Sequence, residues 1–354
     1  MIIHELSSGE SVDLRNNSLV VSFPDRRNVV STSKLNGGYR EDIQAVYNHY
    51  IPPHIGHSCN LEGGSVDAYL KIHTERLGLS YEHSVGILTA ARMENVSVKT
   101  RSFRDLQVTA LITGGVEVNG GRAGDPAGYY EENSRWIKVG GTINTILIIN
   151  ADLPEATMVR AIMTATEAKS AALQELMAPS RYSKGIATGS GTDDIIVVAN
   201  PLSPYRFEYA GKHSKLGELI GLVVKESTKE ALEKQTGLNA ERQCDVLERL
   251  TRYKIKENDF LQGIDEGINQ DYFIRELKNI ARDRQLVAIT AALLHLLDEY
   301  SWGLLAADCV RTVGKKLLAQ IGPIKRNVDF GLQVEEELLS DLVGIIKQKA
   351  CMKG

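Results

Sequence analysis

Short runs of apolar and β-branched residues recur through the first two thirds of the chain and predict buried strands. The runs are SLVVSF (18–23), NVVSTS (28–33), HSVGILTA (83–90), SVKTRS (97–102), LQVTALITG (106–114), TINTILIIN (142–150) and DDIIVVAN (193–200). Several neighbouring runs have no helical stretch between them. This order favours layered, mixed or antiparallel sheets with covering helices over a doubly wound parallel sheet.

Helical periodicity is clearest over 153–176, where Pro154 suits a first turn. The positions expected to face the core of the fold are Val159, Ile162, Met163, Thr166, Leu173 and Leu176. A second helix over 214–234 runs into QTGLN, in which Gly237 is placed as a helix terminator.

Beyond Gly237 the pattern becomes helical throughout, with amphipathic stretches over 240–257, 269–298, 302–321 and 332–350. Turn-forming residues mark the same change, because 22 of 31 Gly and 8 of 9 Pro fall before residue 235. We therefore predict a layered α/β domain over 1–236, with an α-β-β-α arrangement as one option. An all-α helical domain is expected over 237–354.

Composition excludes several classes of protein. The 354 residues carry 41 basic and 45 acidic side chains, a net charge of -4, so the concentrated basic face typical of nucleic-acid binding is not indicated. No run approaches the roughly 20 apolar residues of a membrane helix, and MIIHELSSGE lacks the pattern of a signal peptide. We expect a cytoplasmic protein without nucleic-acid or membrane partners. Its four cysteines are too far apart in sequence to indicate a zinc ribbon, and free thiols are expected.

Four glycine-rich segments end or interrupt predicted strands: LNGGYR (35–40), ITGGVEVNGGRAGDP (112–126), VGGTIN (139–144) and IATGSGTDD (186–194). Glycine permits close approach of a ligand to the backbone, and exposed N–H groups bind carbonyl oxygens or anions, although any single segment is equally well a turn. None matches the phosphate-binding G-x-x-x-x-G-K-[ST] pattern, so nucleotide hydrolysis is a weak alternative.

Three histidines and a cysteine lie close together in YNHYIPPHIGHSC: His49, His54, His57 and Cys59. Prolines and a glycine within this segment exclude a regular helix, so a helical ligand face is not available. Metal binding by a loop stays open, while polar surface histidines are the more common outcome.

Thr142 stands at the head of a predicted buried strand, directly after Gly141. A threonine hydroxyl is a nucleophile when a base removes its proton, and an N-terminal threonine uses its own amine for this. Taken alone, strand propensity is the better explanation of the residue, because threonine is β-branched.

The motifs taken in order resemble one family, the adenosylcobinamide amidohydrolases. They are NGG (36–38), GILTAAR (86–92), TGG followed by Asn119 and AGD (123–125), GTIN (141–144), TEAK (166–169), ATGSGTDD (187–194) and YAGKHSKLGELI (209–220). The resemblance covers about residues 20–230 and leaves the helical tail outside. It departs at Ser190, where threonine is expected, and a hydroxyl is retained there.

This resemblance implies hydrolysis of the amide that joins the corrin ring to aminopropanol in adenosylcobinamide, giving adenosylcobyric acid and 1-amino-2-propanol for corrinoid salvage. The corrinoid is then a small-molecule substrate and no cofactor is implied, while metal content and homo-oligomerisation stay open. A shorter segment, GTINTILIINADLPEATMVRAI, is similar in layout to self-processing β-aminopeptidases and ornithine acetyltransferases, which share an α-β-β-α fold.

Amide hydrolysis needs a nucleophile, a base and donors for the developing oxyanion. On the resemblance we assign Thr142 as nucleophile, Asn119 and N–H groups of the 114–121 loop as oxyanion donors, and Glu167 as a base or water-orienting group. Substrate contacts are assigned to Asn36, Gly37, Gly38, Asn144, Lys169, Thr188, Gly189, Ser190 and Asp193.

Two side-chain pairs within these motifs have alternative roles. Glu167 and Lys169 point roughly 200° apart on a helix, so at most one of them faces a given site. Asp193 and Asp194 either bind the substrate's amide edge or cap the glycine-rich turn. Without attack by Thr142, a water activated by Glu167 or an Asp would give the same products.

Two other classes of function remain as alternatives. A corrinoid-binding protein would grip the amide edge without chemistry, with His49, His54 or His57 approaching cobalt. A self-processing peptidase or acyltransferase would consist of two chains after cleavage at Gly141–Thr142.

Overall fold

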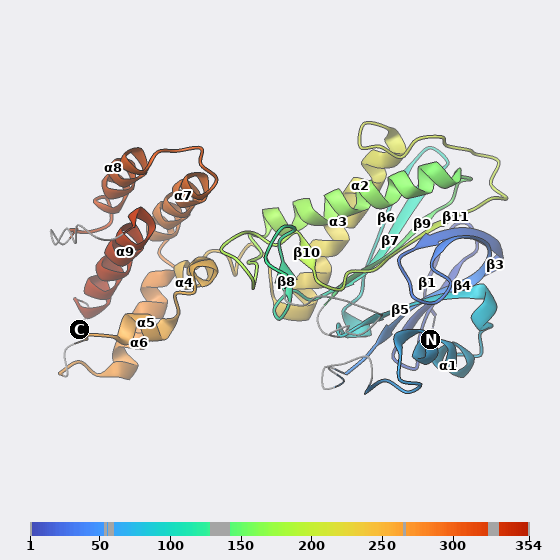
Figure 1. Ribbon diagram of the computed structural model, residues 1–354, viewed down its shortest axis with the longest axis horizontal. Coiled ribbons are helices and arrows are strands. Elements are labelled where there is room, and N and C mark those ends of the chain that lie inside the picture. Colours follow the sequence, from blue (N-terminus) through green and yellow to red (C-terminus); the bar gives the residue numbers. More distant parts are fainter. Residues whose placement is uncertain are drawn as a thin grey trace. The chain divides into compact units, whose positions relative to one another are not determined.

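The computed structural model describes residues 2–52, 55, 60–127, 142–264, 267–324 and 333–352. The chain divides into two compact units, Met1–Asn239 and Ala240–Gly354. The first is an α/β unit and the second is all-helical (Figure 1).

Most strands of the first unit belong to a single mixed sheet. They are β1 (Ile2–Glu5), β2 (Ser11–Arg15), β3 (Ser18–Ser31), β4 (Gly38–Tyr50), β5 (Ser84–Thr89), β6 (Ser97–Phe103), β7 (Leu106–Gly114), β9 (Ile143–Ile149) and β11 (Ile195–Ala199). The order is β1-β2-β3-β11-β9-β7-β6, with β4 paired to β3 and β5. A separate pair joins β8 (Gly120–Gly121) to β10 (Gly189–Ser190).

The long strand β3 makes the sheet curl, because one of its edges changes partner along its length. That edge pairs with β2 over residues 18–22 and with β11 over 28–31, while the other edge pairs with β4 in both halves. The sheet thereby forms two facing layers. One layer contains β2, β3, β4 and β5, and the other contains β6, β7, β9 and β11. Apolar side chains from both layers meet in an interlayer core that includes Val21, Val46, Val85, Leu111, Ile146 and Ile196.

Helices cover both outer faces. On the layer that contains β7 and β9 lie α2 (Glu155–Glu175) and α3 (Lys215–Thr236), packed against each other and against strand residues such as Leu147 and Val197 (Figure 1). On the opposite layer, α1 (Val66–Arg76) buries Leu70 against Tyr47 and Val20. The unit is thus layered α-β-β-α, the arrangement named as an option from the sequence.

Two predicted strands, 18–23 and 28–33, are one strand in the structure. The charged FPDRR segment between them carries β-bulges between Ser22, Arg27 and Val29 in the pairing with β4. Arg27 remains buried in the middle of the strand because its guanidinium is paired with the equally buried Glu10 at 2.9 Å. A charged run therefore did not end the strand, since its central charge has a buried partner.

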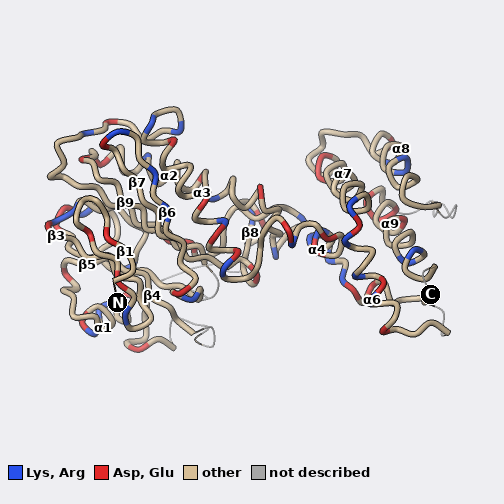
Figure 2. The backbone as a smooth tube through the Cα atoms, turned by 180° about the vertical axis from the view of Figure 1, so that it is seen from behind, with Lys and Arg blue, Asp and Glu red and all other residues tan. Residues whose placement is uncertain are grey.

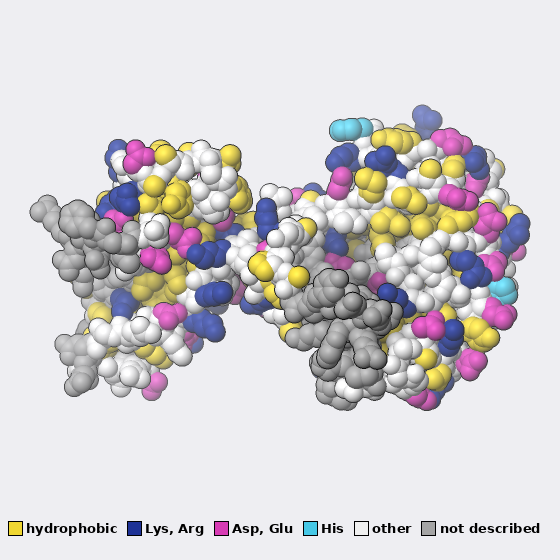
Figure 3. All heavy atoms as spheres, in the orientation of Figure 1, with side chains coloured by type: hydrophobic (Ala, Val, Ile, Leu, Met, Phe, Trp, Pro, Cys, Tyr) yellow, Lys and Arg dark blue, Asp and Glu magenta, His cyan; other side chains and the backbone are white. Residues whose placement is uncertain are grey.

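The core-facing side of α2 agrees with the prediction only in part. Leu173 and Leu176 are buried and Ile162 packs against the core, whereas Val159 and Met163 are about half exposed and Thr166 is exposed. Much of the buried face consists instead of small residues, among them Ala161, Ala165 and Ala172. Small residues let α2 approach both the sheet and α3 closely, and this close packing outweighs the larger apolar area of the alternative stripe. Hydrophobic side chains consequently appear on the surface of this unit (Figure 3).

Helix ends follow local capping rules. Pro154 is the N-cap of α2, and α3 ends at Gly237, which has φ 72° and donates its N–H to Glu233 O. The predicted terminator is confirmed, because the left-handed conformation at this position favours glycine.

The second unit consists of α4 (Val246–Leu250), α5 (Glu257–Leu261), α6 (Gln270–Ala281), α7 (Arg284–Ser301), α8 (Ala307–Leu318) and α9 (Val334–Cys351) around an apolar core of their own. The predicted helix 269–298 is two helices, because Asp283 caps the N-terminus of α7 by accepting from Leu286 N. The prediction over 240–257 was too long, since only α4 and the start of α5 are α-helical there.

Both signs of charge are interspersed along the chain in each unit (Figure 2). Among the residues that the structure describes, no helix combines the length and apolar character needed to cross a membrane.

Candidate active site

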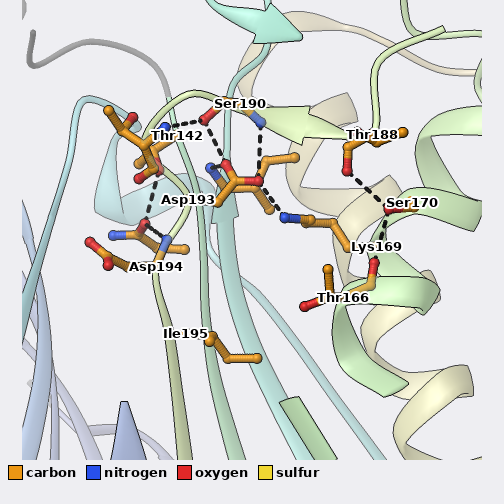
Figure 4. Close-up of polar contacts among 12 residues, drawn as sticks. Thr142, Thr166, Lys169, Ser170, Thr188, Ser190, Asp193, Asp194 and Ile195 are labelled. Carbon is orange, nitrogen blue, oxygen red and sulfur yellow. Dashed lines mark hydrogen bonds and ion pairs between the residues drawn. The ribbon is translucent and has the colours of Figure 1, made fainter. Parts of the chain in front are cut away.

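The predicted motif residues are brought together where two parallel strands begin. β9 and β11 are adjacent and in register, with Thr145 opposite Ile195. The segment 142–144 and the loop 189–194 therefore lie side by side at the same edge of the sheet (Figure 4). The pair β8–β10 joins that loop to the glycine-rich loop around Gly120.

Thr142 is 3% exposed and its hydroxyl lies between two carbonyl oxygens. Oγ1 is 3.1 Å from Asn144 Oδ1 and also within hydrogen-bonding distance of Thr192 O. Both partners accept a hydrogen bond, so the single hydroxyl proton points toward one of them. The position of Thr142 is further fixed because its own carbonyl accepts from Gly115 N at 3.1 Å.

Asp193 anchors the loop beside Thr142. Its carboxylate accepts from Ile143 N at 2.9 Å and from Ser190 through both N (3.0 Å) and Oγ (2.6 Å), and it pairs with Lys169 of α2 (Figure 4). The Lys169 and Asp193 side chains are only 13% and 14% exposed. A charge-assisted pair in this setting ties α2, the loop and the start of β9 into one arrangement.

Gly189 is required by this arrangement. A Cβ at this position would overlap Asp193 Oδ2 and lie 3.1 Å from Lys169 Nζ. Gly191, two residues further, has nothing within 4 Å of the equivalent position. Only the first of these loop glycines is needed for close packing around the ion pair.

Asn144, two residues after Thr142, uses both atoms of its side-chain amide in hydrogen bonds within the protein. Its Nδ2 donates to Asn48 Oδ1 and to Leu88 O, each at 2.8 Å, and its Oδ1 accepts from Asp194 N at 3.3 Å. Asn48 in turn donates to Thr113 Oγ1 at 2.7 Å. Thr113 opens the TGG motif but was given no role from the sequence, and Asn48 was not singled out, although a polar residue at an inward-facing strand position is a usable signal once β4 is known.

Asn119 reaches the same region from the other glycine-rich loop. Its Nδ2 lies 3.5 Å from Thr192 Oγ1, and the backbone oxygen of Thr192 is the partner of Thr142. The structure therefore brings Asn119, Thr142, Asn144, Lys169 and the loop of Ser190 and Asp193 into one cluster.

Asp194 has a buried carboxylate at the edge of this cluster. Burial raises the pKa of Asp194, an effect that the hydrogen bond from Thr32 Oγ1 at 2.6 Å opposes. The carboxylate of Asp194 thus bonds Thr32, while its backbone N–H is the group that reaches Asn144 Oδ1 in the cluster.

Other predicted site residues lie elsewhere. Glu167 is on the opposite side of α2 from Lys169, half exposed, and pairs with Lys212 at 2.7 Å. Thr188 accepts from Ala123 N at 2.9 Å. Asn36 fixes a turn by donating to Tyr81 O and Ser84 O, and Gly37 and Gly38 belong to the same turn.

His49 lies in strand β4 and not in a loop. It is buried, with Nδ1 2.8 Å from Ser18 Oγ and Nε2 2.9 Å from Tyr69 OH, so both ring nitrogens are engaged within the protein. His54, His57, Cys59 and Gly141 lie outside the described residues. Within the described part of the chain, no group of three or more His, Cys, Asp or Glu side chains has a metal-binding arrangement.

Comparison with known proteins places this site in a family. The chain is 35% identical over 239 residues to an uncharacterized protein of Methanocaldococcus jannaschii, covering 62% of this chain and 86% of that protein. It is 32% identical over 213 residues to the adenosylcobinamide amidohydrolase of Methanosarcina mazei, covering 58% of this chain and 89% of that enzyme.

Among solved structures, the crystal structure of the PH0078 protein from Pyrococcus horikoshii OT3 overlaps 65% of this chain and 81% of its own, with 12% identity and a TM-score of 0.32. The family model for adenosylcobinamide amidohydrolase matches residues 3–240, which is almost the whole first unit and contains every residue of the cluster. The chain therefore belongs to the adenosylcobinamide amidohydrolase family and is an amidohydrolase.

Proposed function

We propose that the protein hydrolyses the amide bond between the corrin ring and aminopropanol in adenosylcobinamide. The acyl carbon gains the hydroxyl of water to give adenosylcobyric acid, and the nitrogen gains the hydrogen and leaves as 1-amino-2-propanol. The observation that carries the proposal is the family match over residues 3–240, whose motifs converge at Thr142. The products would return an incomplete corrinoid to cobalamin synthesis.

In this proposal Thr142 Oγ1 attacks the amide carbonyl, and Asn119 with N–H groups of the 114–121 loop stabilises the oxyanion. The C–N bond then breaks and releases 1-amino-2-propanol, which leaves an ester on Thr142 that water hydrolyses to the carboxylic acid. Support comes from the position of Thr142 directly before β9, where its carbonyl bonds Gly115 N of this loop and Asn119 reaches Thr192 of the neighbouring loop. We leave Glu167 out of the proposed site, because its carboxylate is engaged by Lys212 on the far side of α2.

A proton acceptor is also required, because the two carbonyl partners of Thr142 cannot remove its proton. Two routes supply one. If the chain opens before Thr142, the new amine is the base. If it stays intact, a carboxylate activates a water molecule that attacks directly; Asp194 at the end of the 189–194 loop, whose pKa burial raises, is the proposed candidate, because Asp193 is held by Lys169. Mass spectrometry of the purified protein distinguishes the two routes.

The test is incubation with adenosylcobinamide followed by chromatography for both products. Wild type should release adenosylcobyric acid and 1-amino-2-propanol in equal amounts, and Thr142→Ala should lower the rate at least about 100-fold. Lys169→Met and Glu167→Ala form a matched pair two residues apart on α2. The first should lower the rate and the second should not, because only Lys169 holds the loop.

Each outcome has a separate meaning. No turnover by wild type refutes the proposed function. Full activity of Thr142→Ala removes the nucleophile assignment and leaves the function intact. An equal loss of rate in Lys169→Met and Glu167→Ala would show that Glu167 belongs to the site.

A further inference from the structure

The interlayer core changes from apolar to polar at the end where Thr142 lies. Alternate residues of a strand face the same side of the sheet. Asn48, Thr113 and Asn144 therefore lie in the rows of side chains that point from β4, β7 and β9 into the interlayer core. The apolar members of those rows two residues away are Val46, Leu111 and Ile146. Asn48, Thr113 and Asn144 are each no more than 2% exposed. The hydrogen bonds of Asn48 cross from β4 to β7 and β9 and thus join the two sheet layers.

A single backbone carbonyl fixes the direction of every hydrogen bond in this network. Leu88 O can only accept, so the Asn144 group 2.8 Å from it is the amide nitrogen. The second N–H of that nitrogen requires an acceptor, which makes Asn48 present Oδ1 at 2.8 Å. Asn48 Nδ2 is then directed at Thr113 Oγ1. The network therefore determines which side-chain atom of Asn48 and of Asn144 is the oxygen and which is the nitrogen.

The same logic directs the carbonyl oxygen of Asn144 toward Thr142. With both N–H groups of Asn144 used, Oδ1 is the atom that faces Thr142 Oγ1 at 3.1 Å. Rotation of the Asn144 amide would place its nitrogen against Thr142 and Asp194 N, and it would leave Asn48 Oδ1 facing another oxygen. Asn48 therefore acts together with Leu88 O and Asp194 N to hold the Asn144 amide with Oδ1 toward Thr142, although Asn48 and Thr142 share no hydrogen bond.

Stability alone does not require this network. Replacing a buried hydrogen-bonded group and its partners by apolar side chains of similar shape is often neutral for folding. We propose that Asn48 is a positioning residue for the reaction at Thr142, acting through Asn144 to fix the hydroxyl of Thr142. This inference rests on the proposed function, and it assigns a role to a residue outside the GTIN, TEAK and ATGSGTDD motifs.

The test compares Asn48→Leu, Asn48→Asp and Thr109→Val. Leucine removes both hydrogen bonds of Asn48, whereas a protonated aspartic acid keeps an acceptor for Asn144 and a donor for Thr113. Thr109→Val is the control, because Thr109 is equally buried on the same face of β7 and its hydroxyl bonds Thr100 at 2.8 Å, away from Thr142. Turnover of adenosylcobinamide is measured together with hydrogen exchange of β4, β7 and β9.

We expect Asn48→Leu to lower kcat about 10- to 100-fold with KM nearly unchanged, because Asn48 is buried and cannot touch the substrate. Thr109→Val should change kcat less than about 3-fold. Asn48→Asp should recover activity relative to wild type as the pH falls from 8 to 6, because burial raises the pKa of the introduced carboxyl and the protonated form mimics the amide.

Two results overturn the inference. If wild type does not turn over adenosylcobinamide, the proposed function and this inference fall together. If wild type is active and kcat follows only the loss of hydrogen-exchange protection across all three variants, Asn48 is merely structural and the proposed function stands.

Discussion

Mild acid should destabilise the first unit through two buried histidines on the α1 side of β4. The rings of His49 and His73 lie with centroids 3.6 Å apart and planes tilted by 30°, and each ring has one nitrogen within 2.9 Å of Ser18 Oγ. Burial, with a contribution from His73, lowers the pKa of His49 to about 3. Burial and then the charge of Arg76 lower the pKa of His73 to about 4.

The direction of the pH effect on stability follows from the lowered pKa values of His49 and His73. An unfolded histidine has a pKa of about 6.5, so between that pH and about 4 the unfolded chain binds more protons than the folded one. The stabilising contribution is complete above about pH 6.5 and is lost as the pH falls through this window. Each pH unit is worth about 1.4 kcal/mol per group, which gives about 2 kcal/mol per histidine at pH 5 and about 4 kcal/mol for the pair. Most carboxylates titrate below about 4.5, so the window from 6.5 to 5 isolates the histidines.

Hydrogen exchange of peptides from β4 and α1, at several pH values and corrected for the intrinsic rate, measures this free energy in the first unit alone. The double variant His49→Asn/His73→Gln keeps polar groups facing Ser18 but cannot titrate, so its stability should be nearly flat over the window. His295→Gln is the control, because His295 is 64% exposed in the second unit. The reasoning is refuted if wild type and the double variant lose the same free energy between pH 6.5 and 5.

Two further predictions concern packing in the first unit. Gly189→Ala should displace Asp193 and lower turnover at least about 10-fold, whereas Gly191→Ala, with open space at its Cβ position, should leave turnover unchanged. Equal activity of the two variants would show that the ion pair between Lys169 and Asp193 does not depend on a glycine. Arg27→Met should lower the free energy of unfolding by about 3–5 kcal/mol, because it leaves the carboxylate of Glu10 buried without a partner. Adding Glu10→Gln should recover part of that loss in the hydrogen exchange of β2 and β3, and no recovery would argue against the buried charge as the cause.

The sequence contained most of the strands and much of the cluster. β7, β9 and β11 were predicted because a strand buried on both faces is a nearly continuous apolar run. The family motifs identified Thr142, Lys169, Ser190 and Asp193, and the helical angle between Glu167 and Lys169 limited the site to one of them. Contacts now distinguish the two, since Lys169 pairs with Asp193.

β4 was missed, and Asn48 with it. Its first half carries the consecutive charged residues Arg40, Glu41 and Asp42, which interrupt the alternation of apolar and polar residues that predicts a strand. The strand exists because it pairs along the whole of β3 and with β5, and such long-range hydrogen bonds leave no local signal.

The sequence by itself determined most of the strands, the end of α3 at Gly237 and the family to which the chain belongs, because apolar runs, terminating glycines and family motifs are local features. The tertiary structure alone decided that Val159 and Met163 of α2 are exposed while Ala161 and Ala165 are buried, since packing of small residues against two neighbours outweighs the larger apolar stripe. It also decided that Asn48 lies behind Asn144 and Thr142. Residues separated by nearly a hundred positions meet only when the sheet curls, and no local pattern encodes the direction of that curl.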